Sequence, residues 1–169
     1  MFKVGDYIVY GSEGVCRVET IGPVPVASMD QSKSYYTLSP VYHTGVIYAP
    51  ADARVPMRPM LTRDEAFDLI RSVPDIAEAP ELPADPKRVA AEYRSCLQAN
   101  DCKKLLRLIR AVHKKRALAA ALGRGFGQTD DRFFKRAKEL LYGELALSLG
   151  IPVERVEDEI AREAGESAG

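Results

Sequence analysis

Basic side chains in the second half of the chain have the spacing needed to bind phosphates. Four of them stand at intervals of four, three and four residues: Lys103, Arg107, Arg110 and Lys114. At about 100° per residue, these positions fall on one side of a helix, within an arc of roughly 60°. No acidic residue lies between Lys103 and Lys114. This basic row favours contact with a polyanion, such as the phosphate backbone of a nucleic acid.

Further basic residues surround this row. Residues 87–138 contain fifteen basic and four acidic residues and lie between two acidic stretches, although the net charge of the chain is zero. The next predicted helix adds Arg132, Lys135, Arg136 and Lys138. We predict that DNA is contacted by Lys87, Arg88, Arg94, Lys103, Arg107, Arg110, Lys114, Lys115, Arg116 and Arg124. No zinc-finger spacing or basic zipper is present, so we expect backbone contacts, with sequence preference supplied by another component.

Two interpretations of the basic row compete. Like charges at i,i+4 repel by roughly 0.2–0.5 kcal/mol per pair, and a solvated face normally mixes both signs, which favours an external polyanion. Alternatively, the last predicted helix folds back and neutralises the row with its own acids, which are Glu154, Glu157, Asp158, Glu159 and Glu163.

Other candidates for chemistry lack partners. His43 and His113 are far apart and have no clustered carboxylate or cysteine, so neither is predicted to bind metal or catalyse. Three unevenly spaced cysteines predict neither a disulfide framework nor a zinc site. The glycines of residues 123–127 follow a helix rather than a strand, which indicates a connection rather than a phosphate loop. We therefore expect no enzyme, no cofactor, no metal and no small-molecule ligand.

The elements that carry these residues divide into strands and then helices. Strand patterns occupy residues 2–10, 15–21, 34–38 and 46–48, and the prolines up to Pro59 exclude helix from most of this region. Close spacing of short strands suggests a small barrel over residues 1–60. Without a long apolar run, the chain is expected to be soluble and cytoplasmic, with no membrane contact.

Helical signals begin with a capping box from Thr62 to Glu65, which predicts a short helix ending near Arg71. Residues 61–84 form this helix and a linker, residues 85–164 form a basic helical domain, and residues 165–169 form a disordered tail. Helices are expected over residues 86–99, 101–122, 129–150 and 152–164, with the first capped by Asp85 before Pro86. The predicted fold class is α+β, a small β-barrel followed by an all-α C-terminal domain.

Three segments resemble one known family. FKVGDYIVY at residues 2–10, with GV at residues 14–15, resembles the start of CarD/CdnL-type transcription regulators. The same module occurs in the transcription-repair coupling factor, TRCF. VIYAP at residues 46–50 resembles its last strands, and KRAKELLYGELAL at residues 135–147 resembles the helical domain that the regulators have and the coupling factor lacks.

The resemblance implies a Tudor-like or SH3-like barrel that docks on the β subunit of bacterial RNA polymerase, partly by aligning a strand. The matching strand contains Val46, Ile47, Tyr48 and Ala49, although a basic residue often stands where this chain has Tyr48. It also implies a monomer whose helical domain approaches promoter DNA at the upstream edge of the bubble. The family typically stabilises the open complex, while polymerase and its sigma factor supply sequence specificity.

One departure from the family concerns a tryptophan that inserts at the bubble edge, because this chain has no tryptophan. The matching region lies near Pro86 and Val89, and Tyr93 is the nearest aromatic residue. We therefore expect weaker open-complex stabilisation, which a tryptophan introduced at Val89 would strengthen. Two other functions stay open: an adaptor that binds polymerase without touching DNA, and a factor associated with RNA or the ribosome.

Overall fold

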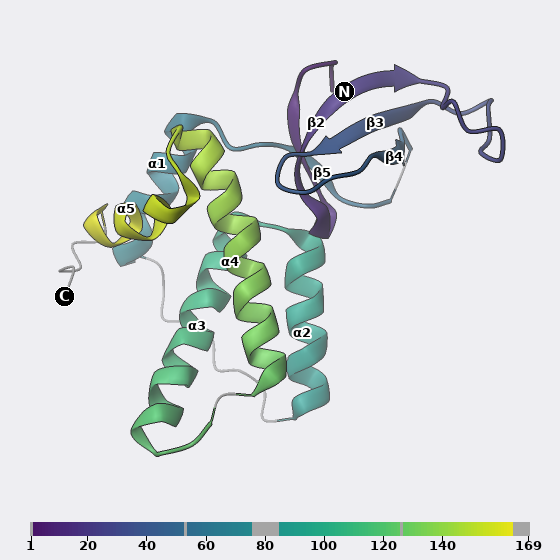
Figure 1. Ribbon diagram of the computed structural model, residues 1–169. Helices are drawn as coiled ribbons and strands as arrows, with labels where there is room; N and C mark the ends of the chain where they lie inside the picture. The colour runs from purple at the N-terminus through teal and green to yellow at the C-terminus, as the bar shows by residue number, and fades with distance from the viewer. Residues whose placement is uncertain (1, 53, 76–84, 126, 164–169) are drawn as a thin grey trace. The chain divides into compact units, whose positions relative to one another are not determined.

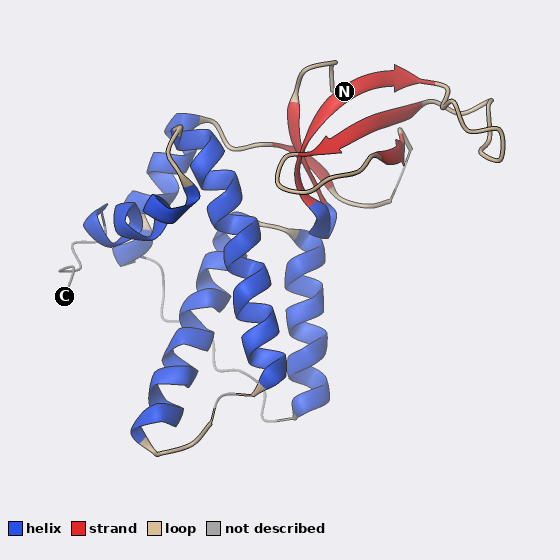
Figure 2. Cartoon of the chain, viewed as in Figure 1, coloured by secondary structure: helices blue, strands red, loops and turns tan. Residues whose placement is uncertain are grey.

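The computed structural model describes residues 2–52, 54–75, 85–125 and 127–163 of the 169-residue chain. It divides into two compact units, Met1–Met60 and Leu61–Gly169 (Figure 1). The first unit consists of strands and the second of helices (Figure 2). This arrangement confirms the predicted α+β class, a β domain followed by an all-α region.

The first unit is a five-stranded antiparallel sheet in the order β4-β3-β2-β1-β5. Its strands are β1 (Tyr7–Tyr10), β2 (Gly14–Gly22), β3 (Tyr35–Pro40), β4 (Ile47–Pro50) and β5 (Met57–Pro59). A shift of register between Val18 and Thr20 interrupts the pairing of the long strand β2 with β3. Such bulges bend a strand and increase its twist. In the described residues, the ladder ends at β4 on one side and at β5 on the other.

The strand prediction needed three corrections. The pattern over residues 2–10 forms a strand only from Tyr7 to Tyr10, after a turn at Gly5 with φ 92°. The predicted strand over residues 46–48 begins one residue later and extends to Pro50, which leaves Val46 just before β4. The strand β5 was not predicted, because it has three residues, ends in Pro59 and carries no alternating pattern. Proline lacks the N–H that a ladder needs, and it is tolerated here because β5 is an edge strand.

The core of the sheet is small. Ile8, Cys16, Val18, Tyr36, Leu38 and Ala49 form one buried cluster. Phe2 lies edge-to-face against Tyr36, with 5.8 Å between ring centroids. Glycines at positive φ make the tight connection from β1 to β2, at Gly11 with φ 45° and at Gly14 with φ 86°. A Cβ atom would strain both positions.

The second unit contains five α-helices: α1 (Arg63–Arg71), α2 (Pro86–Ala99), α3 (Cys102–Ala121), α4 (Gln128–Leu149) and α5 (Val156–Glu163). The predicted capping box is confirmed, because Glu65 N donates to Thr62 Oγ1 and Thr62 N donates to the Glu65 carboxylate. The side chains of Asp85 and Asp101 cap α2 and α3. The last predicted helix was placed too early, since a 3-10 turn (Val153–Arg155) precedes α5.

One core joins the helices. The predicted buried face of α3 is confirmed at Leu105, Leu108, Ile109 and Val112. These side chains share a cluster with Ala66 and Ile70 of α1, Tyr93 of α2, Phe133 and Leu141 of α4, and Val156 of α5. The short helix α1 is therefore packed into the helical unit. The predicted linker falls largely on residues 76–84, outside the described residues.

A buried carboxylate holds the first residue of this unit. Leu61 N donates to Glu144 Oε2 over 2.9 Å, and Ser148 Oγ donates to the Leu61 carbonyl over 2.8 Å. The Cys102 thiol donates to the other oxygen of Glu144 over 3.2 Å. These contacts fix the start of the helical unit on α4. None of the helices in the described residues combines the length and apolar character that crossing a membrane requires.

Candidate functional site

In the basic row predicted on α3, the two end residues are exposed, whereas the two middle residues are partly buried or hydrogen-bonded within the protein. Lys103 and Lys114 are exposed, and neither pairs with an acid among the described residues. Arg107 is half-buried, and its Nε is buried without a hydrogen-bond partner. Arg110 donates from Nη1 to the carbonyl of Val73 over 2.8 Å. The row therefore presents two unpaired ammonium groups beside two guanidinium groups that also contact the protein.

The contact of Arg110 has a structural purpose. Val73 opens the 3-10 turn Val73–Asp75 that follows α1, and Arg110 ties this turn to α3. A guanidinium has five N–H donors, and Arg110 as a residue is exposed. Arg110 can therefore hold the turn and still offer donors to an external anion.

Lys115 is a joint between helices. Its Nζ lies 2.9 Å from Asp130 Oδ2, while Tyr93 Oη donates to Asp130 Oδ1 over 2.6 Å. The ring of Tyr93 stacks on Phe133 with 4.1 Å between centroids, and Asp130 itself is buried in the first turn of α4. Burial above all, together with the hydrogen bond and charge of Asp130, raises the pKa of Tyr93. These contacts link α2, α3 and α4, and the charge of Lys115 is partly neutralised by Asp130.

The predicted position for an introduced tryptophan was wrong. Val89 is buried in the core of the helical unit, so a larger side chain there would face Tyr93 and its neighbours rather than an external partner. Tyr93 is also buried and cannot act as an inserted wedge. The side chains that α2 exposes are instead basic ones, including Lys87, Arg88 and Arg94.

The basic residues of α4 contribute less open charge than the sequence suggested. Lys135 pairs with Asp131 at 3.1 Å, Arg136 with Glu139 at 3.0 Å, and Lys138 with Glu157 at 3.7 Å. Arg116 and Arg124 are exposed at the end of α3 and in the loop after it. Sequence reasoning missed Lys104, which is exposed on α3. Lys104 could have been identified because it lies within residues 102–129, a stretch that contains no acidic residue.

The acidic helix α5 lies against α1 and α4. Its ion pair to another helix joins Glu157 to Lys138 of α4. Within the described residues, no ion pair connects α5 with the four residues of the basic row. The geometry therefore gives no support to neutralisation of that row by α5.

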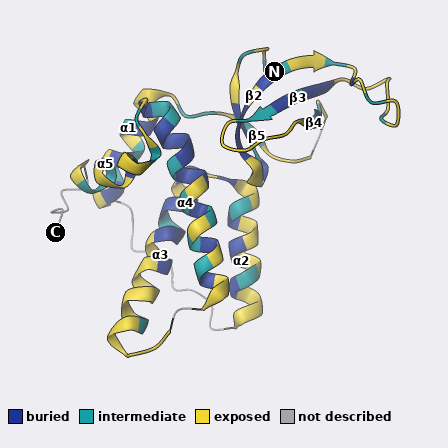
Figure 3. Cartoon of the chain, viewed as in Figure 1, coloured by how far each residue is buried: buried dark blue, intermediate teal, exposed yellow. Residues whose placement is uncertain are grey.

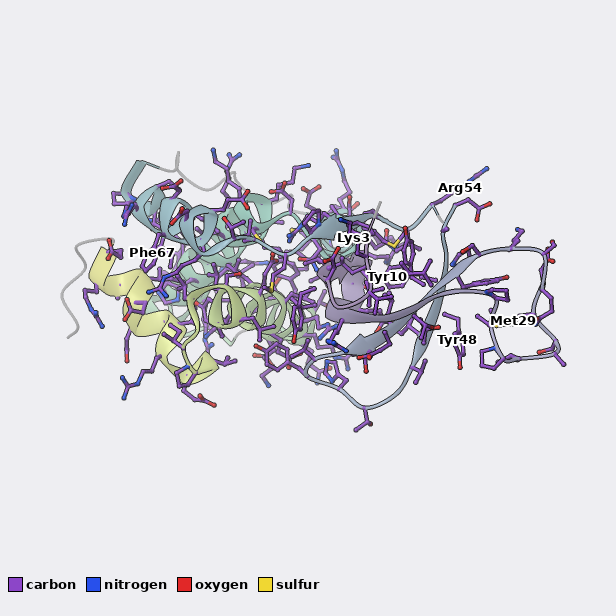
Figure 4. The ribbon with its side chains drawn as sticks, turned by 90° about the horizontal axis from the view of Figure 1, so that it is seen from above. Lys3, Tyr10, Met29, Tyr48, Arg54 and Phe67 are labelled. Atoms are coloured by element: carbon purple, nitrogen blue, oxygen red, sulfur yellow. The ribbon has the colours of Figure 1, made fainter. Side chains whose placement is uncertain are left out.

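The predicted polymerase-binding strand lies at an edge of the sheet. Strand β4 pairs with β3 alone, with Tyr36 opposite Ala49 and Leu38 opposite Ile47. Ala49 is fully buried and Ile47 packs on the same core, while Tyr48, labelled in Figure 4, is half-buried. Val46 is 58% exposed. This edge offers the side chains of Val46 and Tyr48, whereas Ala49 offers its backbone.

Two more exposed apolar side chains precede this edge. Val41 and Tyr42 lie in the connection from β3 to β4, and sequence reasoning did not select them. With Val46, they make the connection more apolar than a solvated loop requires. The described residues contain no group of three His, Cys, Asp or Glu able to hold a metal, and the three cysteines are buried and form no disulfide.

Comparison with known families shows what the first unit is similar to. Residues 2–61 match the family model described as the CarD-like/TRCF RID domain, a match that spans all five strands. The first unit is similar to the RID domains of that family. This confirms the resemblance drawn from the sequence for that part of the chain. RID domains are protein-interaction domains, and their family interacts with the β subunit of RNA polymerase. No curated protein matches the chain.

Proposed function

We propose that this chain is a bacterial transcription regulator that binds the RNA polymerase β subunit through its RID domain and promoter DNA through its helical unit. One observation carries the proposal: the chain combines an RID domain with a helical unit, and helix α3 of that unit exposes several cations and contains no acidic residue. Binding to the DNA backbone would modulate the stability of the open complex at the upstream edge of the bubble.

Docking on polymerase is supported by the exposed edge of β4. An edge strand leaves backbone N–H and C=O groups available, and a strand of a partner can pair with them. Val46 and Tyr48 would supply side-chain contacts beside this pairing, while Ile47 and Ala49 keep the strand attached to its own core. Tyr48 carries no charge, so the contact depends on backbone pairing and apolar area.

Contact with DNA is supported by the exposed cations of α2 and α3. Those with no acidic partner among the described residues are Lys87, Arg88, Arg94, Lys103, Lys104, Lys114 and Arg124. Lysine and arginine bind phosphates without reading the base sequence. The helical unit would therefore stabilise the complex of RNA polymerase with a promoter that the polymerase has already selected.

The decisive experiment measures the lifetime of a polymerase–promoter open complex with and without the protein, at two salt concentrations. A longer lifetime that shortens again as salt rises is expected, because phosphate contacts release counterions on binding. An unchanged lifetime at both concentrations would contradict action on the bubble. Binding to polymerase alone would then support the adaptor function, and stronger competition by RNA than by duplex DNA would support an RNA-associated factor.

A matched pair of variants tests the basic surface. Lys103→Gln with Lys114→Gln removes two unpaired cations, whereas Lys135→Gln removes one that already pairs with Asp131. We expect the double variant to lower the slope of log affinity against log salt by about 1.8, at about 0.9 per phosphate contact. The Lys135 variant should leave the slope close to that of the unmodified protein.

A further inference from the structure

The end of α3 extends beyond its last ion pair with α4. Lys115 contacts Asp130 in the first turn of α4, and α3 then continues to Ala121. We call residues 114–122 the α3 tip. Every residue of the α3 tip is exposed except Ala119, which is half-buried, and this end of α3 is drawn as exposed in Figure 3. Apart from the contact of Lys115 with Asp130, the residues that the structure describes leave this helical surface largely exposed.

Two leucines dominate the apolar part of this surface. Leu118 is 62% exposed and Leu122 is 59% exposed. Together with Lys114 they stand at i, i+4 and i+8, which places the three side chains in one row along the helix. The residues around the leucines are Ala117, Ala119, Ala120 and Ala121. Such small neighbours leave the leucines as a raised ridge that another helix can approach closely.

The charge around the ridge indicates what approaches it. On the helix, Lys114 and Lys115 lie on the side of the leucines, Arg124 follows them in the loop, and residues 102–129 contain no acid. A second copy of this chain would bring these like charges together, which is unfavourable. A partner with acids beside its apolar residues would be attracted instead.

We propose that the α3 tip docks an amphipathic acidic helix of another protein. Apolar side chains of that helix cover Leu118 and Leu122, and its carboxylates face Lys114. This interaction goes beyond the proposed function, because phosphate contacts do not require the two leucines. A lipid surface is less well matched, since binding to it scales with buried apolar area and the α3 tip offers two leucines and no aromatic side chain.

The probe for this proposal is a synthetic helical peptide of roughly 16 residues, long enough for a stable helix. Leucines at i, i+4 spacing form one face and glutamates flank them, and a control peptide carries glutamine in place of each glutamate. Binding of the labelled peptide to the full chain is followed by fluorescence anisotropy. Amide chemical shifts then locate the contact, which is expected at residues 114–122.

Two variants separate the alternatives. Leu118→Gln with Leu122→Gln should weaken peptide binding at least tenfold while leaving the melting temperature unchanged, because both side chains are exposed. Val46→Gln, which changes an equally exposed apolar residue in the other unit, is the matched control and should not affect peptide binding. The peptide that carries glutamine should bind at least tenfold more weakly than the acidic one.

Several results would overturn the proposal. Equal binding of the acidic peptide by the double-leucine variant would remove the ridge as its site. Loss of binding to anionic vesicles or to duplex DNA in that variant, with peptide binding retained, would assign the leucines to lipid or nucleic acid. A dimer of the unmodified protein that the variant abolishes would assign them to a second copy. The open-complex assay is a separate readout, so it fails or succeeds independently of this one.

Discussion

At the scale of single residues, burial sets the chemistry of two thiols. Cys16 is fully enclosed in the core of the sheet, and Cys96 lies in the core of the helices. Burial, assisted for Cys16 by Glu13 and for Cys96 by Glu92, raises the pKa of each thiol to about 11 from the ordinary value of 9.0. Both thiols therefore stay protonated at neutral pH and are poor nucleophiles.

These shifts predict how stability depends on pH. Because the folded pKa exceeds the unfolded one, each thiol contributes stability that is fully present below pH 9 and is lost as pH rises through about 11. Urea unfolding between pH 8 and pH 11 should therefore show a shallower decline for Cys16→Ala and for Cys96→Ala than for the unmodified protein. Identical declines in all three proteins would contradict the inferred shifts.

A second residue-scale prediction concerns α2. Val89→Trp inserts a large ring into a filled core and should lower the free energy of unfolding by about 1–3 kcal/mol. Arg88→Trp, at the exposed neighbouring position, should change the free energy of unfolding little. Chemical denaturation of the two variants measures the difference. Equal stability of the two would show that Val89 does not face the core.

The burial of Val89 could have been predicted from the sequence. Val89, Tyr93 and Cys96 stand at i, i+4 and i+7, which marks the inward face of a helix. The resemblance to the family pointed to the same stretch and led to the prediction that position 89 faces DNA. Val89 is instead buried in the core of the helical unit. The bond from Tyr93 to Asp130 could not have been predicted, since 37 residues separate the two and only the packing of α2 on α4 brings them together.

At the scale of elements, local signals predicted the helices better than the strands. The capping residues Thr62, Asp85 and Asp101 can be recognised from about four consecutive residues of sequence. The predicted starts of α1, α2 and α3 therefore agree with the structure. The bond from Arg110 to Val73 depends on how α3 meets the turn after α1, which no local pattern encodes. The sequence thus indicated which side of α3 is basic, but not which cations remain open there.

Adjacent lysines on α3 should consequently behave differently. Lys115→Gln leaves the buried carboxylate of Asp130 with Tyr93 but without its cation, which should lower the free energy of unfolding by about 1 kcal/mol, since Lys115 is partly exposed. Lys114→Gln should not change stability and should lower the salt slope of DNA binding by about 0.9. Thermal unfolding and salt titration of both variants test this contrast, which a similar melting temperature for the two would refute.

At the scale of the whole molecule, the two candidate interfaces lie in different units. The first unit, which is similar to RID domains, carries the β4 edge, and the helical unit carries the exposed cations. Each unit also has its own core of buried residues. Changes to exposed residues of one unit should therefore leave the partner of the other unit bound.

This independence predicts a reciprocal loss of binding. Val46→Glu places a charge beside the β4 edge and should weaken polymerase binding at least tenfold without changing affinity for duplex DNA. Val4→Glu is its control, because Val4 is 60% exposed in the same unit and lies before β1, which β2 and β3 separate from β4.

Lys103→Gln with Lys114→Gln should have the opposite effect, with weaker DNA binding and unchanged polymerase binding. Each variant alone should shorten the open-complex lifetime, because retention on polymerase and contact with DNA are both needed. If Val46→Glu reduced DNA affinity as much as polymerase affinity, the two units would bind as one surface rather than bind separate partners.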